Sequence, residues 1–539
     1  MDKYKKFMYI GIFILLISLV SSAGTYAWFT WISPSNTSVT LSIGNLADVT
    51  FTSGPDINIS NLAPVYNYTD GVSTTFTVRN ANSTDSLLYK VKLEITSIAN
   101  ELKDESFKYT LLKDNKVVKT GNLKDAVNGN TLILNTSSLD KGSTSSPKIS
   151  TFKLYFWIDG NMENNSNMMN KSLVGKIDVG VETNVLTNTE SSISSTSKFL
   201  NTEVPRQNIK TLKYVDNLNI PEGATVVDVS KNGDNTIKMW YNEADANGNY
   251  DITIGSNNTI YANPSSFELF SNLTNVTSID LSNMDTSGMT NMFNMFSDNT
   301  SLTNITFGDN FNTANVTNMG GMFKNCTILK TIDLSSFDTS NATIFASMFM
   351  NCQGLQNLDL KSFNTSNVER METMFYNCSS LTSLDLSSFN TSNVERMEGM
   401  FYNCSSLTSL DLSNFNTSKI TDMTYMFNRC KSLTNINLSS FDTSNVSSLY
   451  DAFAGLTSLK VLDLSSFDTS KVTNMGRMFL NSNNLVTIYV SDLWNISNVT
   501  SASRMFEGCT SLKGAVPYDS SKTDASMANY TNGYLTKKL

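Results

Sequence analysis

A Met-Phe pair that recurs every 26 residues through the second half of the chain constrains its fold more than any other sequence feature. The pair or a close relative stands at Met295-Phe296, Met322-Phe323, Met348-Phe349, Met374-Phe375, Met400-Phe401, Met426-Phe427, Ala452-Phe453, Met478-Phe479 and Met505-Phe506. Two of the steps are 27 residues long, and Leu269-Phe270 stands one period upstream, which gives ten copies. Residues 363–388 and 389–414 differ at only two positions. A fixed period of this length predicts a solenoid of stacked units.

Each unit is predicted to contain a short strand and a short helix. Residues 381–386 have the Leu-x-x-Leu-x-Leu spacing of a strand whose leucines point inward, and the turn residues 390–393 follow. Residues 392–395 have the Ser-x-x-Glu spacing of a helix capping box. One helical stripe would then be formed by Met397, Met400, Phe401 and Cys404. Stacked units would pair their strands into a parallel sheet, and the rod would be about 45–50 Å long.

All six cysteines occupy one position of the repeat, three residues after the phenylalanine of the Met-Phe pair. They are Cys326, Cys352, Cys378, Cys404, Cys430 and Cys509. The same position holds Leu456 and Ser482 in two other units, so it indicates tight packing and buried free thiols. Cysteines in adjacent units are close enough for disulfides by Cα distance, but parallel side chains hold their Cβ atoms too far apart without distortion. We expect no metal site there.

The residue between the last two leucines of each strand should face solvent on the concave side. It is aspartate in six of nine strands: Asp280, Asp333, Asp359, Asp385, Asp411 and Asp463. We take this column as a candidate binding site for cations or for a basic partner surface. Repulsion between carboxylates about 5 Å apart would raise their pKa values. The alternative is simple inheritance of a repeated residue, with each carboxylate solvated or bonded to a neighbouring Ser or Thr.

A second polar column is predicted to be a ladder of turn residues bonded to the backbone. It consists of Asp338, Asn364, Asn390, Asn416, Asp442 and Asp468. Asn and Asp favour such turns because their side chains can accept hydrogen bonds from nearby main-chain amides.

Residues 210–539 resemble the BspA-like leucine-rich repeats of bacterial surface proteins. The resemblance rests on Phe-[Asp/Asn]-Thr-Ser-Asn, as at 337–341 and 363–367, followed by the Met-Phe segment. It divides this region into an N-terminal cap (210–266), the repeats (267–511) and a C-terminal cap (512–539). Ala452 and Leu456 depart from the pattern, but both remain apolar. The resemblance implies a leucine-rich-repeat fold and adhesion to host matrix proteins or other cells.

The N-terminal region, residues 28–188, is predicted to form an antiparallel β-sandwich of the jelly-roll or Ig-like kind. Apolar and polar residues alternate along 39–43, 74–78, 89–95, 152–157 and 176–181. Residues 24–29, 39–44, 57–64 and 75–80 resemble the TasA/camelysin family of exported bacterial β-sandwich proteins. The resemblance implies export and cleavage after Ala27. Camelysin is described as a protease, but a chain without histidine lacks the usual zinc ligand, so this activity is not carried over.

The first 27 residues have the pattern of a secretory signal. Basic residues up to Lys6 precede an apolar run at 7–20, which is shorter than the roughly 20 residues of a membrane span. Cleavage is expected near Ala23 or Ala27, and the alternative is an uncleaved anchor. Residues 189–209 are rich in Ser and Thr and are predicted to be a flexible linker, with a long loop of the sandwich as the alternative.

The 539-residue chain has no histidine, which excludes Ser-His-Asp and Cys-His catalysis. A net charge of −9 argues against a nucleic-acid-binding surface, and no cofactor motif is present. The predicted fold is a β-sandwich followed by an α/β leucine-rich-repeat solenoid of about ten units. The predicted function is that of a secreted or cell-surface bacterial protein, not an enzyme, which binds host matrix, a neighbouring cell or biofilm matrix through its repeats. The alternatives are a fibre component that assembles through the sandwich and a hydrolase that uses paired carboxylates.

Overall fold

The computed structural model describes residues 39–538 apart from 44–45, 53–56, 60–63, 81–86, 141, 144, 163–164, 170, 183, 188–192 and 265–266. The chain divides into two compact units, Met1–Glu182 and Thr183–Leu539. The signal segment and Ala27 lie outside the described residues, as does part of the predicted linker.

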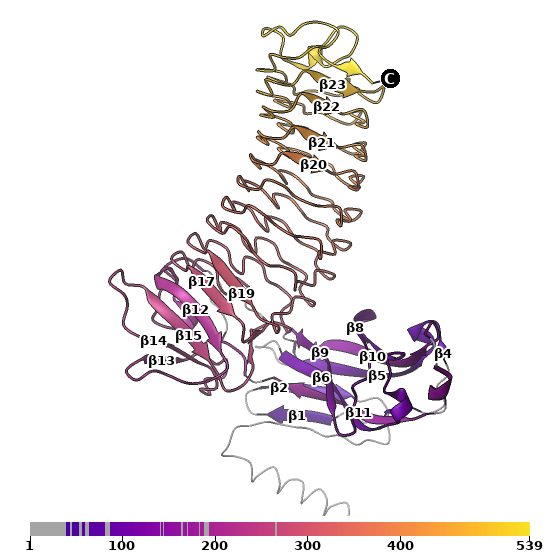
Figure 1. Ribbon diagram of the computed structural model, residues 1–539, viewed down its shortest axis with the longest axis vertical. Helices are drawn as coiled ribbons and strands as arrows, with labels where there is room; N and C mark the ends of the chain where they lie inside the picture. Colours follow the sequence, from indigo (N-terminus) through magenta and orange to yellow (C-terminus); the bar gives the residue numbers. More distant parts are fainter. Residues whose placement is uncertain are drawn as a thin grey trace, which may run out of the picture. The chain divides into compact units, whose positions relative to one another are not determined.

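The first unit is built from two sheets of mostly antiparallel strands (Figure 1). The larger sheet has the order β1 (Val39–Ile43), β2 (Leu46–Thr52), β5 (Val72–Asn80), β10 (Lys148–Asp159), β7 (Phe107–Lys113) and β8 (Lys116–Asn122), with β4 (Pro64–Val65) parallel to β10. The smaller sheet has the order β3 (Ile57–Ile59), β11 (Leu173–Val181), β6 (Leu87–Ile98) and β9 (Thr131–Leu139). Short 3₁₀ turns are η1 (Tyr68–Asp70), η2 (Asn100–Leu102) and η3 (Asn165–Met168).

The two sheets of the first unit share one apolar core. Alternate residues of β5, β6, β7 and β10 point inward, as the period-two pattern of a half-buried strand requires. Phe76 of β5 and Phe152 of β10 stack at 5.1 Å between ring centroids. Tyr89 of β6, in the other sheet, meets Phe152 edge-on at 6.2 Å. These rings join strands that are far apart in the sequence, so the core forms only when both sheets are in place.

The second unit begins before the repeats. The Leu186 amide donates to the Tyr261 carbonyl at 3.0 Å, and Lys198 pairs with Pro205. Phe199 is fully buried in the core of this unit. The described part of the predicted linker, 193–209, therefore belongs to the second unit. It contains the 3₁₀ turns η4 (Phe199–Asn201) and η5 (Arg206–Asn208).

A six-stranded sheet opens the second unit, and the coils of the repeat follow it. Its order is β13 (Thr225–Asp228), β14 (Lys238–Tyr241), β15 (Tyr250–Gly255), β12 (Ile209–Val215), β17 (Ser278–Leu281) and β19 (Asn304–Phe307). The small sheets are β16 (Ile260–Tyr261) with β18 (Met284–Asp285), β20 (Ser409–Asp411) with β21 (Asn435–Asn437), and β22 (Val461–Asp463) with β23 (Thr487–Val490) and β24 (Thr536–Lys537). One more 3₁₀ turn is η6 (Ala525–Met527).

The predicted α/β fold class is wrong, because no described residue of either unit lies in an α-helix. The segment expected to be helical is a chain of tight turns. Every coil has two residues with left-handed backbone angles, four positions apart, such as Thr373 (φ 54°) and Asn377 (φ 60°). A right-handed helix cannot contain such residues, so the turn repeats instead of continuing into a helix. The continuous parallel sheet expected along the stack is also replaced by short, separate pairings.

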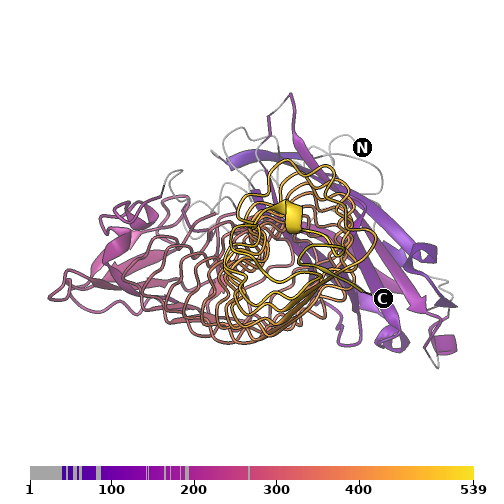
Figure 2. The same cartoon turned by 90° about the horizontal axis from the view of Figure 1, so that it is seen from above.

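Hydrogen bonds between successive coils replace the helical bonds. The Phe375 amide donates to the Met400 carbonyl of the next coil at 3.0 Å, and Phe401 repeats this bond to Met426. The intervening amides close turns within their own coil, as Tyr376 does to the Thr373 carbonyl at 3.1 Å. Figure 2 shows the coils superposed along the stack. The phenylalanines lie directly over one another, with centroids 5.4 to 6.1 Å apart from Phe270 to Phe506.

Candidate binding faces of the second unit

The six cysteines lie in the core of the stack as free, buried thiols. Each thiol donates to a phenylalanine carbonyl of the preceding coil, as Cys352 does to Phe323 at 3.1 Å. The Ser482 hydroxyl fills the same slot and bonds to the Phe453 carbonyl at 2.9 Å. Burial raises the pKa of Cys352 to about 12, so the reactive thiolate is suppressed. In the described part of the chain, no three His, Cys, Asp or Glu side chains are grouped as a metal site.

The aspartates of the predicted binding column lie on the strand side of the coils, and four of them are exposed. Each accepts a hydrogen bond from the amide two residues further along, as Asp385 does from Ser387 at 3.1 Å. The other acceptors are Asp280, Asp333, Asp359, Asp411 and Asp463. These bonds match the alternative in which each carboxylate is held by its own neighbours.

The expected rise in carboxylate pKa values along this column is wrong. Hydrogen bonds from Ser335 lower the pKa of Asp333, and those from Ser387 lower the pKa of Asp385. The backbone amide of Ser413 does the same to the pKa of Asp411. Donors that bond to the ionised form stabilise it, and water screens the repulsion between exposed neighbours. These three carboxylates therefore stay ionised at neutral pH.

The second predicted column is a ladder of turn residues, as expected. The Asn364 side chain accepts from the Ser366 amide at 3.1 Å, and Asp442 accepts from Ser444 at 3.0 Å. The other four members make the same bond: Asp338, Asn390, Asn416 and Asp468.

A further asparagine ladder escaped the sequence analysis. The Asn377 amide group donates to the Asn351 side-chain oxygen at 3.0 Å, and Asn403 donates to Asn377 at 2.6 Å. Asn351 in turn donates to Asn325 at 2.7 Å. These residues stand immediately before the cysteines, at one of the two left-handed positions. Asparagine tolerates that conformation, so its recurrence there was the signal against a helix.

The same side of the coils carries a cluster of aromatic and cationic side chains that we call the Tyr–Arg face. It consists of Tyr376, Tyr402, Tyr425, Tyr450, Arg370, Arg396, Arg429, Arg477 and Arg504, and so contains five of the seven arginines of the chain. Tyr376 and Tyr402 stack at 4.2 Å between centroids. Tyr425 meets Tyr402 edge-on at 5.9 Å and Tyr450 at 5.6 Å. This face leaves no periodic signal in the sequence, because its members occupy different positions of the repeat.

Carboxylates lie beneath the arginines of this face. Glu372 is 8% exposed, accepts from Arg370 Nε at 2.9 Å and has Arg396 Nη1 at 3.6 Å. Asp451 is fully buried, with its Oδ2 atom 3.1 Å from Arg477 Nε. Burial raises the pKa of Asp451, and the positive charge of Arg477 opposes that rise. Burying these charges removes their hydration, so the network is weak evidence for a stabilising role.

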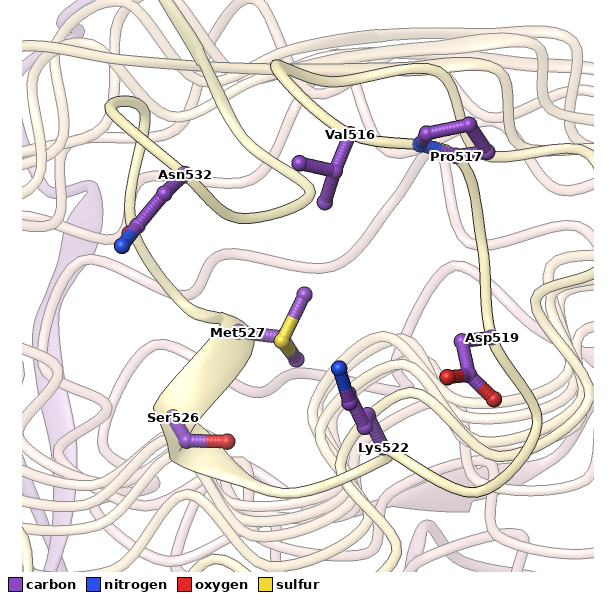
Figure 3. Close-up of a pocket in the computed structure, with 7 residues that line it drawn as sticks. All are labelled: Val516, Pro517, Asp519, Lys522, Ser526, Met527 and Asn532. Carbon is purple, nitrogen blue, oxygen red and sulfur yellow. The ribbon is translucent and has the colours of Figure 1, made fainter.

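A shallow pocket of about 410 Å³ lies in the C-terminal cap. Figure 3 shows its lining residues: Val516, Pro517, Asp519, Lys522, Ser526, Met527 and Asn532. The Asp519 carboxylate accepts from the Ser521 amide at 2.9 Å and from its hydroxyl at 2.7 Å, so it is engaged in a turn.

Comparison with protein families finds a similarity for the coils of the second unit. The family described as "Mycoplasma protein of unknown function, DUF285" matches residues 265–383, 350–437 and 408–519. The repeat region is similar to that family. The family is bacterial, in agreement with the bacterial source expected from the sequence. Comparison with curated proteins found no match. Among the described residues, no helix has the length and apolar character needed to span a membrane.

Proposed function

We propose that this is an exported bacterial surface protein that binds a macromolecular partner through its stack of coils. The observation that supports the proposal most strongly is that each coil keeps its packing residues inside and its polar and aromatic residues outside. Interior residues such as Met374, Phe375 and Cys378 are fully buried, while long polar and aromatic columns remain outside. Solenoids of this kind provide extended binding surfaces whose exposed residues can vary without altering the core. Adhesion to host matrix or to a neighbouring cell, as in the BspA-like proteins, is the form of binding proposed.

Cell fractionation with N-terminal sequencing of the mature chain tests the surface location. We expect the protein in the envelope or the medium, with a mature N-terminus near residue 28. A chain that stays in the cytoplasm with Met1 in place would contradict the proposal.

Binding is tested with the purified mature protein on immobilised matrix proteins and on intact bacterial cells. We expect saturable binding that free protein competes away. A protein that is exported but binds none of these surfaces would leave the adhesin-like role without support and favour assembly.

The second candidate function is a fibre or matrix component that assembles through the first unit. Strands β8 and β9 are edge strands of the two sheets. They expose apolar side chains, with Val117 47% and Ile133 43% exposed. Exposed apolar edge strands favour pairing between chains. Electron microscopy of the purified mature protein should show filaments if this function applies, and single particles if it does not.

A further inference from the structure

We propose that the Tyr–Arg face is a docking surface for an acidic polypeptide. This inference rests on the proposed binding function and assigns it to a specific face and partner chemistry. The face extends over six successive coils, each of which contributes a tyrosine or an arginine. At about 4.8 Å per coil it is about 25 Å long, enough for an extended peptide segment or the edge of a folded protein.

The outward groups of this face are mainly hydrogen-bond donors. The arginine side chains are substantially exposed, with Arg396 at 51% and Arg477 at 37%. A guanidinium has five N–H donors, and the contacts of Arg396 to Glu372 and Glu398, at 3.6 and 3.3 Å, leave donors available. Arg429 lies over the Tyr402 ring, 5.8 Å from its centroid. No Asp or Glu in the described chain lies within 4.0 Å of its guanidinium, although its positive charge opposes the rise in the pKa of the buried Asp451. Carboxylates and carbonyl oxygens of a partner can bind these donors.

The charge balance favours a polypeptide over a highly charged polymer. Five guanidinium groups are matched by four carboxylates: Glu372, Glu398, Asp451 and Glu507. A dense polyanion binds tightly only where many cationic side chains displace its counterions. This face has no such excess of cationic side chains. Tyr and Arg are instead the residues enriched at the centre of protein–protein interfaces.

In the earlier coils, the repeat position that holds Tyr425 and Arg477 is occupied by small residues. Where Tyr425 and Arg477 stand, the earlier coils have Asn294, Gly321 and Ser347. These small residues adopt the same left-handed angles, so the fold does not require Tyr or Arg there. The large side chains are additions to a backbone that is complete without them.

The repeat itself supplies substitutions that preserve the backbone. Tyr402→Asn, Tyr425→Gly and Arg429→Asn each introduce the residue that a neighbouring coil has at that position, namely Asn428, Gly399 and Asn403. The matched control is Asn294→Gly with Lys324→Asn, which changes two of these three columns, those of Tyr425 and Tyr402, in the earlier coils. Thermal unfolding would verify that both variants keep the stability of the parent chain.

The test uses the full mature chain with two probes, a phage-displayed library of random peptides and an array of acidic oligosaccharides. We expect enrichment of peptides rich in Asp and Glu. Their affinity should fall about tenfold or more in the triple variant and stay unchanged in the control. Enriched peptides without acidic residues, or equal affinity for the triple variant, would overturn the proposal. Binding of oligosaccharides alone, lost in the triple variant, would also overturn it. A chain that is exported and adheres normally in the triple variant would refute this face while leaving the proposed function intact.

Discussion

The two units of this protein reach a buried core by opposite routes. In the first unit, Phe76, Tyr89 and Phe152 come from distant parts of the sequence and meet between two sheets. In the second, each coil contacts its copy about 26 residues away, as Phe375 does Phe401. Non-local cores unfold as one cooperative body, whereas stacked repeats depend on nearest-neighbour contacts and on the protection of their ends. Substitutions in the two units should therefore have distinct signatures.

The largest expected effect is that of Phe152→Ala in the first unit. The ring is fully buried and contacts both Phe76 and Tyr89, so its removal should cost about 3–5 kcal/mol. Differential scanning calorimetry should show a lower melting temperature for one transition and no change in the other. A uniform shift of the whole profile would mean that the two units unfold together.

Arg206→Met should have the next largest effect, confined to the second unit. The buried guanidinium donates to the carbonyls of Leu269 at 3.0 Å and Ser271 at 2.8 Å, in the first coil. Among the described residues no amide of an earlier coil donates to these carbonyls, so Arg206 closes the end of the stack. Losing two charge-assisted bonds should cost about 3 kcal/mol. Hydrogen exchange should accelerate first in residues 267–293. Loss of protection that begins at the C-terminal coils would contradict this role.

Asn377→Ala should cost about 1–2 kcal/mol. Alanine removes both ladder bonds and is strained at a φ of 60°. Asn377→Gly is the matched control, because glycine loses the ladder but accepts the backbone angle without strain. Urea unfolding should rank the parent above Gly and Gly above Ala. Equal stability of the two variants would show that the left-handed angle is not the cause.

Cys378→Ser should change stability by about 1 kcal/mol or less. Ser482 already fills the equivalent slot and makes the equivalent bond to Phe453. Burial raises the pKa of Cys378 well above its ordinary value, so the thiol should also resist alkylation until the chain unfolds. Mass spectrometry after iodoacetamide treatment would test this. Rapid alkylation of the native protein would contradict the burial of the six thiols in the core of the stack.

The smallest expected effect is that of low pH on the stability contributed by the aspartates on the strand side of the coils. Lowered pKa values of Asp333, Asp385 and Asp411 contribute stability above their unfolded-state pKa. That contribution is lost only as the pH falls through the lower folded values, below about pH 4. The difference in the free energy of unfolding between the parent and the Asp385→Asn variant should therefore stay constant from pH 7 to pH 5. If the parent became more stable relative to the variant as the pH falls in this range, repulsion between neighbouring carboxylates would be the dominant effect.

The repeat period identified the core of the second unit but not its backbone. Residues such as Met374, Phe375 and Cys378 are all buried, and their spacing fits a helix as well as it fits a series of turns. The distinguishing signal was Asn377, because the asparagine that precedes four of the six cysteines favours a left-handed angle. The Tyr–Arg face could not be found by period at all. Tyr402, Tyr425 and Tyr450 occupy three different positions of the repeat and become neighbours only through the stacking.

The uniform bonding between coils also makes the length of the stack adjustable. The bond from Phe375 to Met400 is repeated from Phe401 to Met426, so a further copy of residues 363–388 could join at that point with every donor and acceptor matched. Recombination between the two nearly identical units would add or remove about 4.8 Å of reach in one event. The fold thus allows a cell lineage to alter how far the molecule extends without redesigning either end.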